Sequence, residues 1–510
     1  MREFSNRDSL GDDEQHKSTT HRRVRTYVLW AALLLASGVP RVVAAFLLPN
    51  EEGDPYSYVR AIEAMRVSMA AGTFSVSDLF GFWLPAYQFI CALISVFVGH
   101  SLYVAKVFSA LCGAGLCVVV FLIAQELTAS RALSLIAFAI IAFSPLHVMY
   151  SAFSLTDVPH AFLVASSLFF VLKERWILAA SCVAVGCLMR IDSWLIIPLL
   201  PALQFLVQRK VSITASFIAL FSPFFWLYVC WAATGNALEY FKVRNDYISE
   251  VLAGGDSFNS FSASRVGANL LAVLYSTGPA VMIACFLAAW LVTKRMSRNG
   301  FSRSSWAPAA TLAYFFLSLG FLVLAYFTRN QPDIWPRYGL ILFALGLPIL
   351  AWTIATIKQQ RPVWAGTILV ALAALCVGQW GLQVRQGWHF IADVSHKRLV
   401  ADYLRDTFRE GRSSKIFCDD STVRVLSGIS ESSFLDSSNA FADQERFLTF
   451  LTKNRVEYLV YERREESPAT DMFWDHKNNG ELFQLVVSTN PGASGLRIQV
   501  YRFTGGGPTS

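Results

Sequence analysis

Twelve apolar runs, each close to the length of a membrane-spanning helix, follow one another along most of the chain. They are 25–48, 84–99, 102–126, 131–150, 158–172, 175–189, 193–208, 210–233, 269–293, 306–327, 338–357 and 363–383. A helix needs about 20 predominantly apolar residues to cross the hydrocarbon core. Only 15% of the 510 residues are charged, whereas soluble chains carry about a quarter. The sequence therefore predicts a polytopic α-helical membrane protein.

The basic residues indicate which of these runs cross the membrane, because Lys and Arg concentrate in cytoplasmic connectors. If all twelve runs cross, connector 294–303, with its four basic residues, falls outside. If 84–99 stays at the outer face, all the basic connectors become cytoplasmic: 173–175, 209–210, 294–303 and 358–361. We therefore expect eleven spans, with 84–99 as a juxtamembrane segment of the first outer loop, 49–101. The net charge of +7 then reflects cytoplasmic connectors, and nucleic acid is not expected as a partner.

The two ends of the chain differ from the apolar part. Residues 1–24 are polar, and we expect a disordered cytoplasmic tail before a transmembrane region that extends over 25–388. The first run lacks a cleavage site and is expected to be a retained signal anchor. Residues 389–510 are less apolar, and their periodicity predicts a small extracytoplasmic α/β domain. Its expected helices are HKRLVADYLRDTFREG and ERFLTFLTKN, and its expected strands are SKIFCDD, VEYLVYE, LFQLVVST and LRIQVYRF.

Acidic residues stand at two of the non-cytoplasmic membrane boundaries. In GDPYSYVRAIEAM, Asp54 lies at the start of a helix that also carries Tyr58 on its apolar face. In SLTDVPH, Asp157 opens the next span, and His160 follows three residues later. Each aspartate is either a helix cap or a functional carboxylate, acting as a general base or as a ligand of a divalent cation. His160 is either a third metal ligand or a hydrogen-bonded core residue.

Arginines stand at two further boundaries on the same side. MRIDSW places Arg190 next to Asp192, and IWPRY places Arg337 next to Tyr338. Arginines at non-cytoplasmic span ends oppose the usual bias and favour an anionic partner such as a phosphate. The alternatives are a local ion pair for the first pair and interfacial anchoring for the second. Arg329, in the same connector as Arg337, is another candidate for binding a phosphate. Connector 234–268 is polar with scattered aromatic residues, as expected for a lid or an acceptor-binding loop.

The order of these motifs resembles that of the GT-C membrane glycosyltransferases, in particular protein O-mannosyltransferases and lipid A aminoarabinose transferases. The motifs are PRVVAAFLL followed by GDPYSY, then LPAYQF, SPLHVMYSAFSLTD and RYGLILFALGLPIL, within residues 25–350. The resemblance implies that Asp54 is the catalytic base, that Asp157 is the second acidic residue and that Arg337 binds the carrier phosphate. Gly-Asp-Pro replaces the family's usual Asp-Glu pair, so metal dependence and sugar identity stay open.

The resemblance implies an inverting glycosyltransferase. Its donor would be a polyprenyl-phosphate sugar that enters from the membrane lipids, and the acceptor hydroxyl, of a protein, lipid or glycan, would enter on the non-cytoplasmic side. The residues leave two alternatives. A transporter or flippase for lipid-linked glycans would carry charges within its spans or inverted repeats. A non-catalytic scaffold would tolerate replacement of Asp54 by Asn.

Overall fold

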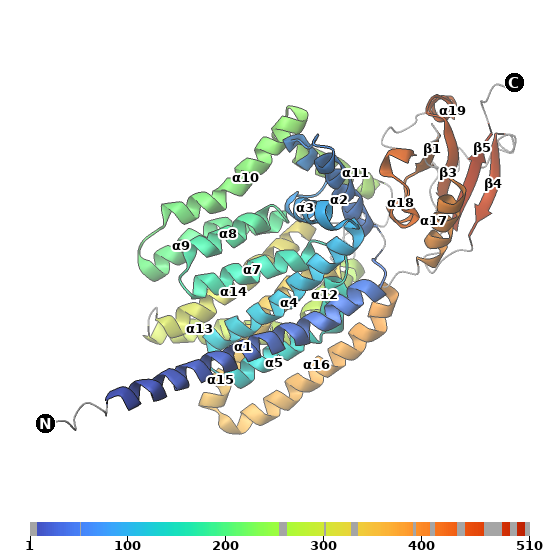
Figure 1. The fold of residues 1–510 in the computed structure, drawn as a ribbon. Helices are drawn as coiled ribbons and strands as arrows, with labels where there is room; N and C mark the ends of the chain where they lie inside the picture. The colour runs from blue at the N-terminus through green and yellow to red at the C-terminus, as the bar shows by residue number, and fades with distance from the viewer. Residues whose placement is uncertain are drawn as a thin grey trace.

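The computed structural model describes residues 8–51, 53–253, 263–299, 302–327, 335–390, 394–408, 414–435, 444–463, 482–489 and 497–504. Most of them form a bundle of long helices, with a small α/β domain at one end (Figure 1). The α-helices of the bundle part are α1 (Asp8–Leu47), α2 (Asp54–Ala70), α3 (Ala86–Val98), α4 (Ser101–Thr128), α5 (Arg131–Ala142), α6 (Pro145–Ser151), α7 (Asp157–Leu172), α8 (Trp176–Cys187), α9 (Ile196–Gln208), α10 (Ile213–Thr234), α11 (Glu239–Ala253), α12 (Ala263–Thr277), α13 (Pro279–Asn299), α14 (Arg303–Phe327), α15 (Leu340–Gln360) and α16 (Pro362–Phe390). Three short 3-10 helices join them: η1 (Val76–Leu79), η2 (Ile191–Leu195) and η4 (Pro336–Gly339).

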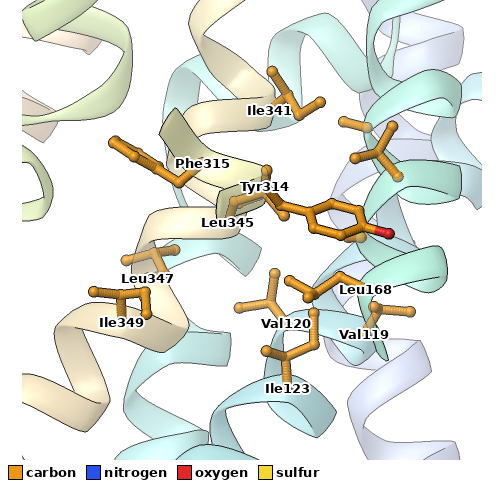
Figure 2. Packing of buried hydrophobic residues seen from close by; sticks show 14 of the residues in the cluster. Val119, Val120, Ile123, Leu168, Tyr314, Phe315, Ile341, Leu345, Leu347 and Ile349 are labelled. Carbon is orange, nitrogen blue, oxygen red and sulfur yellow. The ribbon is translucent and has the colours of Figure 1, made fainter. Parts of the chain in front are cut away.

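Helices α4 and α15 form the centre of the bundle. In their most apolar stretches 67% and 89% of the residues are buried, against 22% in α1 and 11% in α16, which lie at the outside. Figure 2 shows how Val120 and Ile123 of α4 pack near Leu168 of α7 and Leu345 of α15. Apolar residues on all sides are expected for buried spans, because lipid and protein interior are both apolar.

Eight helices in the described part of the chain are long and apolar enough to cross a membrane, or nine if the bent pair α5–α6 counts as one span. The eleven predicted spans are reached when α7 and α8 are added, which are apolar but only 16 and 12 residues long. The structure therefore confirms a polytopic helical membrane protein. Helix α1 begins at Asp8, so residues 8–24 of the expected disordered tail are helical in the structure.

Segment 84–99 forms the short helix α3. Its 13 residues span about 20 Å, so its length resembles that of α8, and its position distinguishes it from the spans. Pro85 occupies the position just before the helix. Helix α3 packs against α2 at the end of the bundle that faces the α/β domain (Figure 1). This position at one end of the bundle agrees with the prediction that α3 is a juxtamembrane helix.

The predicted span 269–293 is divided in the structure. Helix α12 ends at Thr277, Gly278 has a φ of +86°, and α13 begins at Pro279. A side chain at position 278 would meet Gln379, because a Cβ there would lie 2.4 Å from the Gln379 Oε1. Hydropathy stays high across this break, so the apolar run gave no sign of it. The break leaves α12 next to η4, which carries two of the candidate site residues.

The α/β domain contains a five-stranded sheet in the order β2-β1-β3-β5-β4, with β1 parallel to both its neighbours and β5 antiparallel to both of its own. Its elements are α17 (Ser395–Thr407), β1 (Lys415–Cys418), α18 (Ser421–Ser427), η5 (Glu431–Ser433), β2 (Phe434–Leu435), α19 (Gln444–Lys453), β3 (Val456–Arg463), β4 (Phe483–Ser488) and β5 (Arg497–Phe503). All six predicted elements are present. Alternate residues of β1 and β3 face opposite layers, with α17 and α18 packing on one face and α19 on the other.

Candidate functional site

Two hydrogen-bonded contacts fix the start of the first outer loop. Just beyond α1, the carbonyl oxygen of Leu48 accepts a hydrogen bond from the Lys106 Nζ at 2.5 Å. Asn50 is buried and exchanges two hydrogen bonds with Ser154, at 3.2 Å to its hydroxyl oxygen and 3.0 Å from its backbone N–H. The loop after the first span is thereby held against α4 and against the turn before Asp157.

Asp54 is placed by a sharp turn. Gly53 has a φ of +82°, a conformation that glycine adopts without strain, and it occupies the cap position of α2. Asp54 is the first helical residue and follows the cap position. Its Oδ2 accepts a hydrogen bond from the Arg337 Nη2 at 2.5 Å. The alternative of a simple helix cap is thus not what the structure contains.

Arg337 reaches the loop from η4, which comes before the central helix α15. Its side chain is 11% exposed, and its Nη1 lies 3.7 Å from Oε2 of Glu51. The Arg337 Nε is buried and makes no hydrogen bond to the described residues. Gly339 lets η4 approach α12, because a Cβ at that position would lie 1.9 Å from the Ser276 hydroxyl oxygen. The approach of α12 therefore helps to position the guanidinium.

A second ion pair forms in the same region. Asp157 lies in the first turn of α7, behind Thr156 at the cap position, and its Oδ1 accepts a hydrogen bond from the Arg190 Nη1 at 2.8 Å. The Arg190 Nε also lies 3.3 Å from Asp192, so the local ion pair is present as well. The Asp157 side chain is only 6% exposed, and the paired guanidinium offsets the cost of burying its charge.

Aromatic rings join the two ion pairs. The guanidinium carbon of Arg190 lies 5.1 Å from the centre of the Tyr338 ring, and that of Arg337 lies 5.4 Å from it. Tyr58 is buried one helical turn after Asp54, and its hydroxyl group lies 3.3 Å from that of Thr156. Burial raises the pKa of Tyr58 well above its ordinary value, so this phenol stays neutral.

His160 lies behind the second ion pair. Its Nε2 is 2.6 Å from the hydroxyl oxygen of Ser193 and 3.6 Å from Asp192, which supports the interpretation of a hydrogen-bonded core histidine. Within the described residues, no group of three or more His, Cys, Asp or Glu side chains is arranged to hold a metal ion. Asp54 and Asp157, the candidate ligands of a divalent cation, each bind an arginine instead.

Glu51 is a site residue to which the sequence reading gave no role. It lies between α1 and α2, its side chain is 13% exposed, and its buried Oε2 has no hydrogen-bond partner among the described residues. Burial raises the pKa of Glu51 to about 7; Arg337 opposes this rise, and the carboxylates of Asp54 and Asp157 add to it. The acidic stretch Asn-Glu-Glu-Gly-Asp is visible in the sequence. The sequence does not show which of its carboxylates turn toward the interior of the protein.

The structure thus gathers most of the predicted residues into one cluster. Asp54, Tyr58, Asp157, Arg190, Asp192, Arg337 and Tyr338 belong to it, and Glu51 joins them. Arg329 lies outside the described residues. In the second domain, Asp420 follows strand β1 at a place where ligands often bind, but it caps α18 and binds Lys397 at 2.5 Å. That pair accounts for Asp420 without a ligand.

Comparison with known proteins places these observations in context. Residues 76–190 match the family model of dolichyl-phosphate-mannose-protein mannosyltransferases. The matched range contains Asp157 and Arg190, whereas Asp54 and Arg337 lie outside it. No match was found among curated protein sequences. Among solved structures, ArnT from Cupriavidus metallidurans bound to undecaprenyl phosphate is similar, with a TM-score of 0.59 and 13% identity over 93% of this chain and 98% of that one.

The same ArnT in the apo state has a TM-score of 0.54 and 14% identity, over 94% of this chain and 98% of that one. The alignment extends through the bundle and into the α/β domain, since it leaves out less than a tenth of either chain. At this low identity the structural similarity shows a shared fold and no more. The chain therefore has the GT-C fold of integral-membrane glycosyltransferases, and its resemblance to the protein mannosyltransferase and aminoarabinose transferase branch is confirmed.

Proposed function

We propose that this protein is a glycosyltransferase that moves a sugar from a polyprenyl-phosphate carrier to a hydroxyl group of an acceptor. The observation that carries the proposal is the Arg337–Asp54 ion pair, since it puts a phosphate-binding side chain in contact with a carboxylate. The choice of donor is supported by ArnT from Cupriavidus metallidurans, a protein of similar fold whose structure was solved with bound undecaprenyl phosphate.

The donor phosphate would bind to Arg337, next to Arg190. Among the described residues the Arg337 Nε is a buried donor with no hydrogen-bond partner, and the guanidinium carbon of Arg190 lies 5.1 Å from the centre of the Tyr338 ring that Arg337 also contacts. Guanidinium groups bind phosphate oxygens in pairs, and such bonds strengthen as the leaving phosphate gains charge. Tyr338 would lie next to the first isoprene unit of the carrier, with its ring holding both guanidinium groups in place.

Asp54 would act as the general base. Its side chain is 43% exposed, so an acceptor hydroxyl can approach it from water, whereas Asp157 is nearly enclosed. The acceptor oxygen loses its proton to Asp54 and forms a bond to the anomeric carbon. The bond between that carbon and the phosphate oxygen breaks, and the polyprenyl phosphate leaves with the electron pair. One displacement of this kind inverts the anomeric configuration.

The ion pair also suggests how donor binding would prepare the base. In the structure, Oδ2 of Asp54 is occupied by the hydrogen bond from Arg337. A phosphate that draws Arg337 away would leave this oxygen free to accept the proton of the acceptor hydroxyl group. Donor binding would then precede efficient proton removal.

The site is proposed to face the non-cytoplasmic side. The basic connectors lie at the opposite ends of the spans from Asp54 and Arg337, which is the distribution that the positive-inside bias predicts for an outward-facing site. The α/β domain lies at the same end of the bundle as α2, so it would be extracytoplasmic too (Figure 1).

The test uses the full chain in nanodiscs with a panel of radiolabelled polyprenyl-phosphate sugars. We expect release of at least one sugar, and a loss of about 100-fold or more in Asp54→Asn, in the range for a general base. Asp402→Asn is the matched control, because Asp402 also binds an arginine, Arg405, but on the exposed face of α17. Equal release by Asp54→Asn would reject Asp54 as the base. Lipid scrambling without sugar release would identify a flippase, and neither activity would favour a scaffold.

A further inference from the structure

A cavity of about 300 Å³ lies beside the candidate site, between α2 and the segment that leads into α3. Three residues of α2 that line it, Ala61, Met65 and Ser68, follow Asp54 and Tyr58 at steps of three or four residues. Residues at this spacing lie along one face of a helix. Ala61 is seven residues after Asp54, about 10 Å along the helix axis. The cavity therefore continues the face of α2 that begins at the proposed base.

Trp83 forms the wall between the cavity and the site. It lines the cavity, and its ring centre lies 4.6 Å from that of Tyr58. Phe82 also lines the cavity, and its ring lies 4.9 Å from Tyr247 of α11. Helix α11 belongs to connector 234–268, which the sequence predicts to be a lid or an acceptor-binding loop. The cavity is thus bordered by the proposed site on one side and by this connector on another.

Gln88 gives the cavity an unsatisfied polar group. It lines the cavity from α3, is only 3% exposed, and its side-chain oxygen has no hydrogen-bond partner among the described residues. A buried amide oxygen without a partner is costly, so such groups usually have one. Ser68 and Asp78 add a hydroxyl and a carboxylate to the same lining. A ligand with hydroxyl groups would supply the missing donor.

The lining combines flat aromatic faces with these polar groups. Phe80, Phe82 and Trp83 are on the segment before α3, opposite Met65 of α2. A sugar ring has apolar C–H faces and a rim of hydroxyl groups, and it needs this combination. An acyl chain would leave the Gln88 oxygen unpaired. The volume lies at the lower end of the range of about 300–1,000 Å³ for ligand pockets, which suits a single ring.

We propose that this cavity binds one sugar ring of a glycan acceptor, whose reactive hydroxyl group then reaches Asp54. The proposal rests on the proposed function and narrows its acceptor to a glycan. The donor phosphate is assigned to Arg337, which contacts Asp54 directly, whereas the cavity lies two helical turns further along α2. Donor and acceptor therefore approach the base from different directions.

The experiment is saturation-transfer NMR of the full chain in nanodiscs with a mixture of methyl glycosides of glucose, mannose, galactose, arabinose and N-acetylglucosamine. We expect saturation of at least one glycoside. Ala64→Trp, which fills the cavity, should reduce its signal at least five-fold, and Gln88→Leu should also reduce it. Ala70→Trp is the control, since Ala70 is exposed on α2 and does not line the cavity. Thermal unfolding distinguishes a role of Gln88 in sugar binding from a role in stability. Because the replaced oxygen is unpaired, Gln88→Leu should not lower the Tm.

The proposal would be overturned by the absence of saturation for every glycoside, or by a signal that survives Ala64→Trp unchanged. Competition by undecaprenyl phosphate would also overturn it, because the sugar would then occupy the donor site. The sugar-release assay reports on the proposed function separately. Sugar release without glycoside binding would leave the transferase and reject this acceptor site. Glycoside binding that depends on Ala64 and Gln88, without sugar release, would keep the sugar site and reject the transferase.

Discussion

Arg337 donates a hydrogen bond to Asp54 although 283 residues separate them in the sequence. This contact joins the first turn of the juxtamembrane helix α2 to the 3-10 helix that precedes the most buried span, α15. Arg337 would not be stable alone in its position, because a buried charge without a counter-ion is strongly disfavoured. The pair therefore contributes both to the structure of the first outer loop and to the proposed chemistry.

Replacing Arg337 tests its contribution to the proposed chemistry. Arg337→Gln should reduce sugar release by about 100-fold or more, the size expected when a preorganised group that stabilises developing charge is lost. Arg337→Lys keeps the charge but not the planar fork, and should fall between Gln and the wild type. Arg398→Gln, on an exposed position of α17, is the control. An Arg337→Gln variant that is folded and fully active would exclude this residue from donor binding.

Glu51 should make the protein more stable in mild acid than in base. Its pKa rises from 4.5 to about 7 on folding, and an acid with a raised pKa is favoured in its protonated form. This stabilisation is complete below pH 4.5 and is lost as the pH rises through 7. In Glu51→Gln the Tm should therefore change less than in the wild type between pH 5 and pH 8.5, and should be higher than the wild-type Tm at pH 8.5.

The matched control for the pH dependence of the Tm is Glu63→Gln, a glutamate within α2. A hydrogen bond from Arg66 lowers the pKa of Glu63, so its contribution to stability is lost only as the pH falls below its ordinary range. It should leave the difference between pH 5 and pH 8.5 unchanged. If Glu51→Gln has the same pH dependence as the wild type, Glu51 is not the group that titrates near neutrality.

The docking of the α/β domain onto α2 should depend on Arg60. Its guanidinium contacts Glu431 at 2.8 Å and the Ser421 hydroxyl oxygen at 3.0 Å, and the hydroxyl groups of Ser57 and Ser421 also lie 3.0 Å apart. A Ser57→Cys/Ser421→Cys variant should therefore form a disulfide on oxidation, identified by mass spectrometry of the linked peptides. Adding Arg60→Ala should slow its formation several-fold.

Arg66→Ala is the control for this cross-link, since Arg66 lies on the same helix and binds only Glu63 of that helix among the contacts described for it. It should leave the rate of disulfide formation unchanged. Failure of the cysteine pair to cross-link in the otherwise unchanged chain would show that the domain does not rest on α2 in the membrane.

Arg41 should be a residue on which stability strongly depends. It is fully buried in α1, and all five of its N–H groups have acceptors: Ser37 O, Ile141 O, Ala142 O, Ser151 Oγ and His147 Nδ1. Two of these carbonyls lie where α5 and α6 meet at a bend of 61°. Arg41→Leu would leave them unpaired in an apolar environment, and should lower the Tm in detergent by several degrees or prevent folding.

Gly113 provides a second way to test this cluster without removing a charge. A Cβ at position 113 would lie 2.3 Å from the Ser151 hydroxyl oxygen and 3.0 Å from the Arg41 Nε. Gly113→Ala should therefore lower the Tm in the same direction, whereas Gly366→Ala, where a Cβ meets nothing, should not. An unchanged Tm in both Gly113→Ala and Arg41→Leu would contradict the structural role.

Sequence reasoning identified most of this fold because membrane helices and surface charge follow strong rules. The bias of Lys and Arg predicts that α3 stays out of the membrane, although its composition is as apolar as that of a span. The split at Gly278 was missed because hydropathy measures composition, whereas the break comes from a positive φ and from Gln379 on a distant helix. Arg41 was counted as part of an apolar run and received no role. Its hydrogen-bond acceptors include carbonyl oxygens of another segment, which the local sequence does not reveal.

The site was predictable residue by residue but not as a set of contacts. Asp54, Asp157, Arg190 and Arg337 stand out because they are charged residues at span ends on the side opposite to the basic connectors. Which arginine meets which aspartate depends on the packing of four segments, and no local pattern contains that information. Glu51 was missed for the same reason, because the loop turns it toward Arg337 only once Asn50 is fixed to Ser154.

The contact between α2 and α18 has a consequence for how the chain is made. Helix α2 begins at residue 54, and Ser421 of α18 is synthesised 364 residues after Ser57, which it contacts. The α/β domain thus covers part of a helix that is synthesised long before it. A polypeptide released early would carry every apolar span and still present α2 uncovered. In such a chain the contacts of Arg60 and Ser57 with Glu431 and Ser421 would be missing, so α2 would expose to water a charge and a hydroxyl group that the α/β domain otherwise contacts.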